Sequence, residues 1–167
     1  QSFPEQPLPP ERLSGIGCGI EGPDDFWTRA KDFAELLGWM PLRVDARSKA
    51  LYHAACVFAG NFSTAIAAHA DRLLRTATGR DEAMTDYFLP MLETVVAQLR
   101  DHPAEKVLTG PAARGDTHAI DEHLQAIADG APDLREEYRL LSVAILQFSP
   151  LPEEKKRELR HLLERDR

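Results

Sequence analysis

Three polar residues in an apolar stretch are the first candidates for chemistry in this sequence. Lys49, His53 and Asn61 lie in a segment that is otherwise mostly alanine and larger hydrophobic residues. On an α-helix, positions four residues apart differ by only about 40° around the axis. We therefore expect an ammonium, an imidazole and a carboxamide to share one broad stripe of an otherwise buried helix. Buried polar groups are costly without partners, so the protein or a ligand should pair with this stripe.

The amino-acid composition is that of an ordinary globular protein, with 43% hydrophobic and 28% charged residues in a sequence of 167 residues. A net charge of -7 argues against nucleic acid or an anionic membrane as the partner. The proline-rich opening segment does not resemble a signal peptide, and no apolar run approaches the length of a membrane span. For Cys18 and Cys56 we favour two reduced core thiols in a cytoplasmic protein, and a single disulfide in a secreted chain is the alternative.

The elements that position these side chains begin with a strand–helix–strand unit over residues 15–44. Residues 15–21 alternate small and apolar positions, as in a closely packed strand. Pro23 and two acidic residues begin a helix that Gly38 ends, and residues 40–44 form a second strand. Two parallel strands have exposed edges and bury too little surface to stand alone. We therefore expect a larger parallel sheet to precede Gln1.

From residue 46 onward the pattern predicts only helices. They span residues 47–78, 81–100 with a kink at Pro90, 116–129 with Asp116 as N-cap, and 132–148. A strongly charged last helix begins at Pro152 and is expected to face solvent or cap a partner. The predicted domains are therefore residues 1–45, the remnant of an α/β sheet, and residues 46–167, which are all helical.

Three motifs carry a resemblance to a known family. They are residues 1–3 (QSF), residues 51–62 (LYHAAxVFAxNF) and residues 108–116 (LTGPxxRGD). In order and separation, from residue 1 to about residue 148, the chain resembles bacterial Rossmann-like oxidoreductases with a helical C-terminal domain of unknown function. These are relatives of pyrroline-5-carboxylate reductase, ketopantoate reductase and 6-phosphogluconate dehydrogenase.

The resemblance implies a mainly α fold, in which a helical domain like that of 6-phosphogluconate dehydrogenase follows a remnant of a Rossmann-like sheet. It also implies NADP or NAD as cofactor and hydride transfer to or from a carbonyl, imine or hydroxyl carbon of a small molecule. The chain would be the C-terminal part of such an enzyme, inactive without its nucleotide-binding half, and a homodimer through the helical domain. The alternative is a non-enzymatic helical dimerisation or interaction module, in which the strand pair of residues 15–44 would have no use.

The resemblance also implies roles for the polar stripe. His53 is the candidate general acid, because its ordinary pKa near 6.5 suits proton transfer at neutral pH. Lys49 would anchor an anionic substrate group or share the acid role, and Asn61 would hold a nicotinamide carboxamide or a substrate oxygen. The structural alternatives are a core histidine bonded to a backbone carbonyl, a solvated lysine at a helix start and an interhelical hydrogen bond.

Five further residues belong to the candidate site. Gln1 and Ser2 are the candidate cofactor contacts, and Tyr52 and Thr109 are candidate substrate contacts. Arg114 could clamp a carboxylate or phosphate, or form an ion pair that ties its loop to the helices.

Two other patterns are weaker. Residues 17–22 match the dinucleotide-binding pattern G-x-G-x-x-G, but no good strand precedes them, and three carboxylates would face a bound pyrophosphate. We therefore interpret these glycines as packing positions in a strand. His118, Glu122 and His123 have loosely metal-like spacing without a third ligand on the same face, so a solvated helix face is the preferred interpretation and no metal site is predicted.

Overall fold

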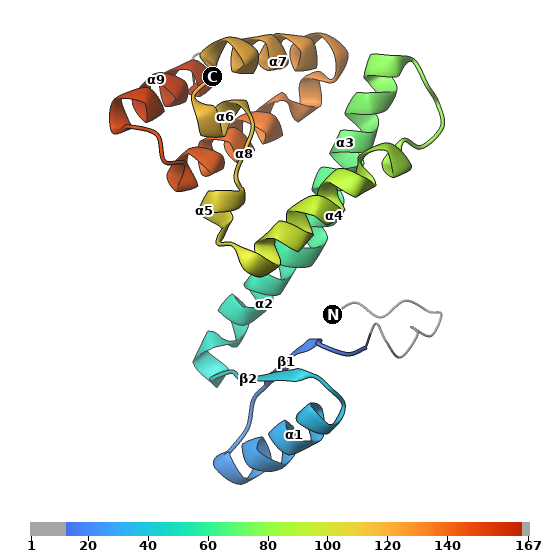
Figure 1. The fold of residues 1–167 in the computed structure, drawn as a ribbon, viewed down its shortest axis with the longest axis vertical. Coiled ribbons are helices and arrows are strands. Elements are labelled where there is room, and N and C mark those ends of the chain that lie inside the picture. Colours follow the sequence, from blue (N-terminus) through green and yellow to red (C-terminus); the bar gives the residue numbers. More distant parts are fainter. Residues whose placement is uncertain (1–12, 165–167) are drawn as a thin grey trace. The chain divides into compact units, whose positions relative to one another are not determined.

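The computed structural model describes residues 13–164 and is mainly helical, with one small parallel sheet (Figure 1). The chain divides into two compact units, which we call unit 1 (Gln1–Ile66) and unit 2 (Ala67–Arg167). A mainly α chain with a strand–helix–strand segment before the helices is the fold class that the sequence indicated. The division between the units lies within a helix, whereas the predicted domain boundary follows residue 45, and that boundary stays a prediction.

Unit 1 contains the strand–helix–strand segment in the predicted order. β1 (Gly17–Ile20) and β2 (Met40–Arg43) pair in parallel, with Gly17 opposite Met40 and Ile20 opposite Arg43. The connecting helix α1 (Asp24–Leu36) follows Pro23, and its first turn carries two acidic residues. Gly38 adopts a φ of 72°, which allows the chain to leave the helix and enter β2. The carboxyl ends of both strands therefore lie at the same edge of the sheet.

The long helix predicted over residues 47–78 is helical throughout but not one regular α-helix. It comprises a 3-10 turn η2 (Ala46–Ser48), α2 (Lys49–Val57), a π-helical segment η3 (Phe58–Phe62) and α3 (Ser63–Thr78). No residue of α2 or η3 is buried in this chain, and Leu51 and Phe58 are 76% and 69% exposed. The expectation that Lys49, His53 and Asn61 lie on a buried element is therefore wrong for this chain.

Unit 2 continues through helices whose bounds differ slightly from the predicted ones. The helix predicted from residue 81 begins only at Thr85, because the Asp71 carboxylate accepts a hydrogen bond of 2.5 Å from the Met84 backbone N–H and holds the preceding turn. The N-cap role predicted for Asp116 is confirmed, since its carboxylate accepts from the Ala119 N–H at 3.1 Å. The helices after α3 are α4 (Thr85–Asp101), α5 (Ala104–Val107), α6 (Pro111–Arg114), α7 (Thr117–Gly130), η4 (Pro132–Leu134), α8 (Arg135–Phe148) and α9 (Glu153–Glu164).

The core of unit 2 joins α7, α8 and α9. Ile120, Leu146, Leu159 and Leu163 are almost completely buried and pack in one cluster. The guanidinium of Arg139, also buried, donates to the backbone carbonyl of Leu163 and pairs with Glu136. The last helix thus exposes most of its charged residues, as expected, and also packs into the core through Leu159 and Leu163.

Other helical surface carries uncovered apolar side chains. On α4 the exposed large hydrophobic residues include Tyr87, Met91, Val95, Val96 and Leu99. Within the described part of the chain, no helix is both long enough and apolar enough to cross a membrane.

Candidate functional site

The carboxyl edge of the β1–β2 sheet carries a polar pocket of about 510 Å³. It is lined by the last residue of β2 and by residues that follow each strand, which together are Glu21, Gly22, Arg43, Val44, Asp45 and Ala46. In open parallel sheets, ligands bind outside the carboxyl ends of the strands. This edge is therefore the place in unit 1 where a ligand is expected, and the sequence could have indicated it from the residues that follow the two predicted strands.

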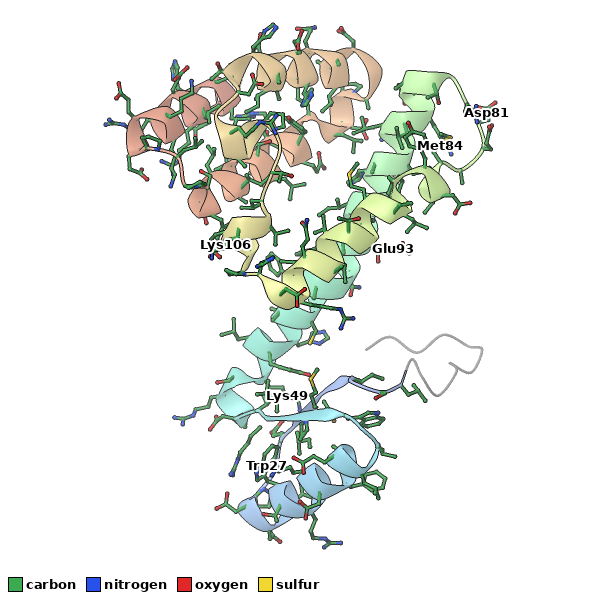
Figure 2. The ribbon with its side chains drawn as sticks, in the orientation of Figure 1. Trp27, Lys49, Asp81, Met84, Glu93 and Lys106 are labelled. Atoms are coloured by element: carbon green, nitrogen blue, oxygen red, sulfur yellow. The ribbon has the colours of Figure 1, made fainter. Side chains whose placement is uncertain are left out.

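Lys49 stands beside this edge at the first turn of α2 (Figure 2). Its Nζ lies 2.9 Å from Oε2 of Glu21, the residue that follows β1. The Lys49 side chain is 70% exposed and the Glu21 side chain 38%, and an exposed ion pair of this kind contributes at most about 1 kcal/mol. A substrate carboxylate or phosphate could therefore replace Glu21 at the ammonium group at little cost.

The neighbouring arginines are also paired. Arg43 forms an ion pair with Asp24, and its guanidinium carbon lies 5.9 Å from the centre of the Trp27 ring. Arg47 Nε lies 3.3 Å from Oδ1 of Asp45, whose carboxylate also caps η2. Cations and carboxylates alternate along this edge, which suits a polar ligand that carries groups of both signs.

Tyr52 packs on the sheet one turn after Lys49. A methyl group added at Gly19 of β1 would lie only 2.6 Å from the Tyr52 ring carbon Cζ, so the glycine is required for this close approach. Burial raises the pKa of the Tyr52 phenol and so does the neighbouring Cys56, while the Gly19 backbone opposes the shift. The phenol therefore stays protonated at neutral pH, and the structure gives Tyr52 a packing role; its substrate contact stays a prediction.

His53 and Asn61 are both exposed. The side chain of neither residue forms a hydrogen bond within the described range 13–164, so the core-histidine bond and the interhelical bond considered as structural alternatives are not seen there. Asn61 lies in the π-helical η3, whose wider turn breaks the α-helical register that the prediction of a shared stripe assumed. Single π-helical turns inside α-helices are frequent at functional sites, which keeps Asn61 a candidate.

Of the remaining predicted site residues, two belong to unit 2 and two lie outside the described residues. Thr109 and Arg114 belong to unit 2, where Gly110, with a φ of 91°, directs the chain into α6. Both side chains are exposed, and within residues 13–164 Arg114 has no ion pair of the kind considered as its structural alternative. Gln1 and Ser2 lie outside the described residues. The structure thus places Lys49, Tyr52 and His53 together on α2.

The glycines of residues 17–22 do not fit a dinucleotide. Gly17 and Gly19 lie inside β1 rather than in the turn after it, and Gly19 accommodates Tyr52. A methyl group at Gly22 would lie 2.5 Å from the Phe26 ring, so this glycine also serves local packing. The carboxylate of Glu21 occupies the turn where a pyrophosphate would need donors. This geometry supports the interpretation of the motif as packing positions.

The three residues with metal-like spacing, His118, Glu122 and His123, do not form a metal site either. His118 Nε2 lies 3.5 Å from Glu122 Oε1 at the surface, whereas His123 turns to the hydroxyl of Tyr138. Among residues 13–164 no three His, Cys, Asp or Glu side chains are placed to hold a metal ion.

Comparison with known proteins identifies two solved structures with a similar fold. A search of curated proteins gave no match. The crystal structure of a protein named "putative NADP oxidoreductase BF3122", from Bacteroides fragilis, matches 88% of this chain with a TM-score of 0.71 and 26% identity. Protein TM1727 from Thermotoga maritima matches 90% with a TM-score of 0.70 and 24% identity, which shows the fold alone.

This chain spans about half the length of those two proteins, covering 54% and 57% of them. The mainly helical fold with its strand–helix–strand segment is therefore shared with part of a protein named as an oxidoreductase. Residues 16–145 match the sequence family described as a domain of unknown function, DUF2520. Because that match covers most of the chain, the protein belongs to the DUF2520 family.

Proposed function

We propose that this chain is the C-terminal part of an NAD(P)-dependent oxidoreductase that transfers hydride to or from a carbonyl, imine or hydroxyl carbon. The observation that carries the proposal is the Lys49–Glu21 pair at the carboxyl edge of the parallel sheet. That edge is where ligands of open parallel sheets bind. The similarity to a protein named as an NADP oxidoreductase supports the reaction class.

In this proposal the residues of α2 bind the substrate and move a proton. The anionic group of the substrate replaces the Glu21 carboxylate beside the Lys49 ammonium group. His53 donates a proton to the reacting oxygen or nitrogen, or accepts one from it. The nicotinamide, when bound, supplies or accepts the hydride. Because the described glycines do not fit a diphosphate, we place the main coenzyme loop outside residues 13–164.

The proposal includes partners for the uncovered apolar surface. Leu51 and Phe58 on α2 and η3, and the exposed row on α4, leave large hydrophobic side chains in water, which soluble proteins keep to small patches. We propose that a nucleotide-binding half and a second copy of the helical domain cover these surfaces. We also propose a cytoplasmic location for the protein, which the two free cysteines support.

The test compares this chain with the longer protein of which, in this proposal, it is the C-terminal part. NADPH titration followed by coenzyme fluorescence should show stoichiometric binding to the longer protein and none to the 167-residue chain. Turnover is then measured as NADPH oxidation with a panel of small ketones, imines and 2-oxo acids. We expect His53→Ala to keep coenzyme binding and far-UV circular dichroism but to lose roughly 100-fold or more in kcat.

The exposed His102, at the end of α4, provides the matched control. His102→Ala should leave turnover unchanged. If turnover of His53→Ala equals that of the natural protein, His53 has no part in the mechanism. If the longer protein binds neither NADPH nor NADH, the oxidoreductase proposal fails, and the helical interaction module with its exposed α4 row becomes the better description.

A further inference from the structure

Unit 2 contains a second pocket that the proposed oxidoreductase site does not use. It has a volume of about 370 Å³ and lies between the C-terminal part of α3, the second half of α7 and the start of α8. Its walls are mostly apolar, with Leu73, Ala77, Ala126 and Ile127 among the lining residues. A pocket of this size and composition is typical of small-molecule sites.

Close helix packing builds this pocket. A methyl group added at Gly130, near the end of α7, would lie 3.0 Å from Cγ2 of Thr76 on α3. Arg72, one residue before Leu73, holds α3 to η4 through a two-pronged ion pair with Asp133, at 2.5 and 2.6 Å. Pairing with Arg72 lowers the pKa of the Asp133 carboxyl, so this ion pair stays charged at neutral pH.

The charge balance of the pocket determines which ligand it suits. Arg72 and Asp133 neutralise each other beside the pocket, and none of the lining residues is a lysine, arginine, aspartate or glutamate. An ionised ligand would therefore lose its hydration without gaining an opposite charge. A neutral, mostly hydrocarbon molecule meets no such cost.

One polar pair interrupts the apolar wall. Nδ1 of His123 lies 2.8 Å from the hydroxyl of Tyr138, and both residues line the pocket. Burial raises the pKa of the Tyr138 phenol, against a smaller opposite effect of Ser142, so the phenol stays protonated at neutral pH.

The neutral His123–Tyr138 pair keeps one donor hydrogen in either tautomer of the imidazole. With Nδ1 accepting from Tyr138, the ring carries its hydrogen on Nε2, and with Nδ1 donating, the phenol keeps its own hydrogen. Nε2 has no partner among the residues that the structure describes. The pocket therefore combines mostly apolar walls with one polar pair that keeps a donor hydrogen.

We propose that the pocket between α3, α7 and α8 binds a small neutral molecule with a hydrocarbon body and one hydrogen-bond acceptor, such as a carbonyl oxygen, which accepts from the His123–Tyr138 pair. The site lies wholly within unit 2 and needs no coenzyme, so it is independent of the proposed oxidoreductase site. It gives the helical unit a ligand of its own.

The test is a titration of the isotope-labelled protein with 4-phenyl-2-butanone, which has an aromatic body and one ketone, followed by amide and histidine nitrogen signals. We expect saturable shifts at Ala77, Ala126 and Gly130 and at the ring nitrogens of His123, with a dissociation constant in the millimolar range for so small a ligand. His123→Phe should weaken binding about tenfold, the usual effect of one hydrogen bond.

Two variants that add the same side chain to α7 separate pocket binding from adventitious contact. Ala126→Phe fills the pocket and should abolish the shifts, whereas Gln125→Phe adds the ring at a neighbouring exposed position outside the pocket and should keep them. Circular dichroism checks that both variants fold.

The proposal is overturned if the wild-type shifts do not saturate, or if Ala126→Phe binds as well as the natural protein. It is also overturned if light scattering shows a dimer that Ala126→Phe dissociates, because a second copy would then occupy the pocket. None of these outcomes involves NADPH, so failure here leaves the coenzyme test of the proposed function unaffected.

Discussion

Removing the side chain of Leu159 tests whether the charged last helix is a structural part of unit 2. Leu159 has no exposed surface, and with Leu163 it inserts α9 into the cluster formed by Ile120 and Leu146. The rest of α9 is strongly charged, and its ion pairs, such as Lys155 with Glu158, are surface pairs that contribute little. The attachment of α9 should therefore depend on its buried leucines.

Leu159→Ala should lower the free energy of unfolding by about 3–5 kcal/mol, the sum of lost hydrophobic transfer and the cavity that remains. For a unit of about 100 residues this corresponds to a fall in Tm of at least roughly 10 °C. The assay is urea unfolding followed by far-UV circular dichroism. Both tryptophans, Trp27 and Trp39, lie in unit 1, so the native tryptophan emission should not change.

Leu140→Ala is the matched control, because Leu140 lies on α8 of the same unit but is 55% exposed. Its loss should be below about 1 kcal/mol. The reasoning is refuted if Leu159→Ala costs less than about 1 kcal/mol, or if both variants lose the same amount. Either result would mean that α9 does not pack through Leu159.

Two further predictions concern local structure. Asp116→Ala should destabilise α7 by about 1 kcal/mol, because the Ala119 N–H loses its acceptor, while Asp116→Asn should retain most of the stability; thermal unfolding of both variants decides this. Gly19→Ala should displace the Tyr52 ring and shift its phenol titration, followed at 295 nm, to lower pH, because burial no longer raises that pKa. Gly17→Ala is the control, because a methyl group there meets no atom within 4 Å, and an unchanged titration of Gly19→Ala would contradict the packing argument.

The parts of the fold that could be predicted are those controlled by local sequence signals. Pro23 with two acids marked the start of α1, Gly38 marked its end, and Asp116 marked the first turn of α7. Each of these signals acts through the backbone of its own few residues. The parallel pairing of the two strands followed from the helix between them.

Burial could not be predicted in the same way, because it depends on which surfaces meet. The apolar α2 looked like a core helix but is exposed in this chain, whereas the charged α9 looked like a surface helix but places Leu159 and Leu163 in the core. The π-helical turn at Phe58–Phe62 has no comparable local signal. It shifts Asn61 out of the predicted register with His53, so the shared polar stripe could not be confirmed.

The exposure of α2 itself bears on the proposed chemistry. Electrostatic catalysis requires a site from which water is excluded, because charges interact weakly in water. Lys49 is 70% exposed and its pair with Glu21 is a surface pair. The same helix also presents uncovered Leu51. A surface that covers this leucine would remove water from the helix that carries His53 and strengthen the attraction of Lys49 for an anion. In this proposal the nucleotide-binding half does two things at once. It covers the exposed apolar surface of α2, and it excludes water from the residues that carry out the chemistry.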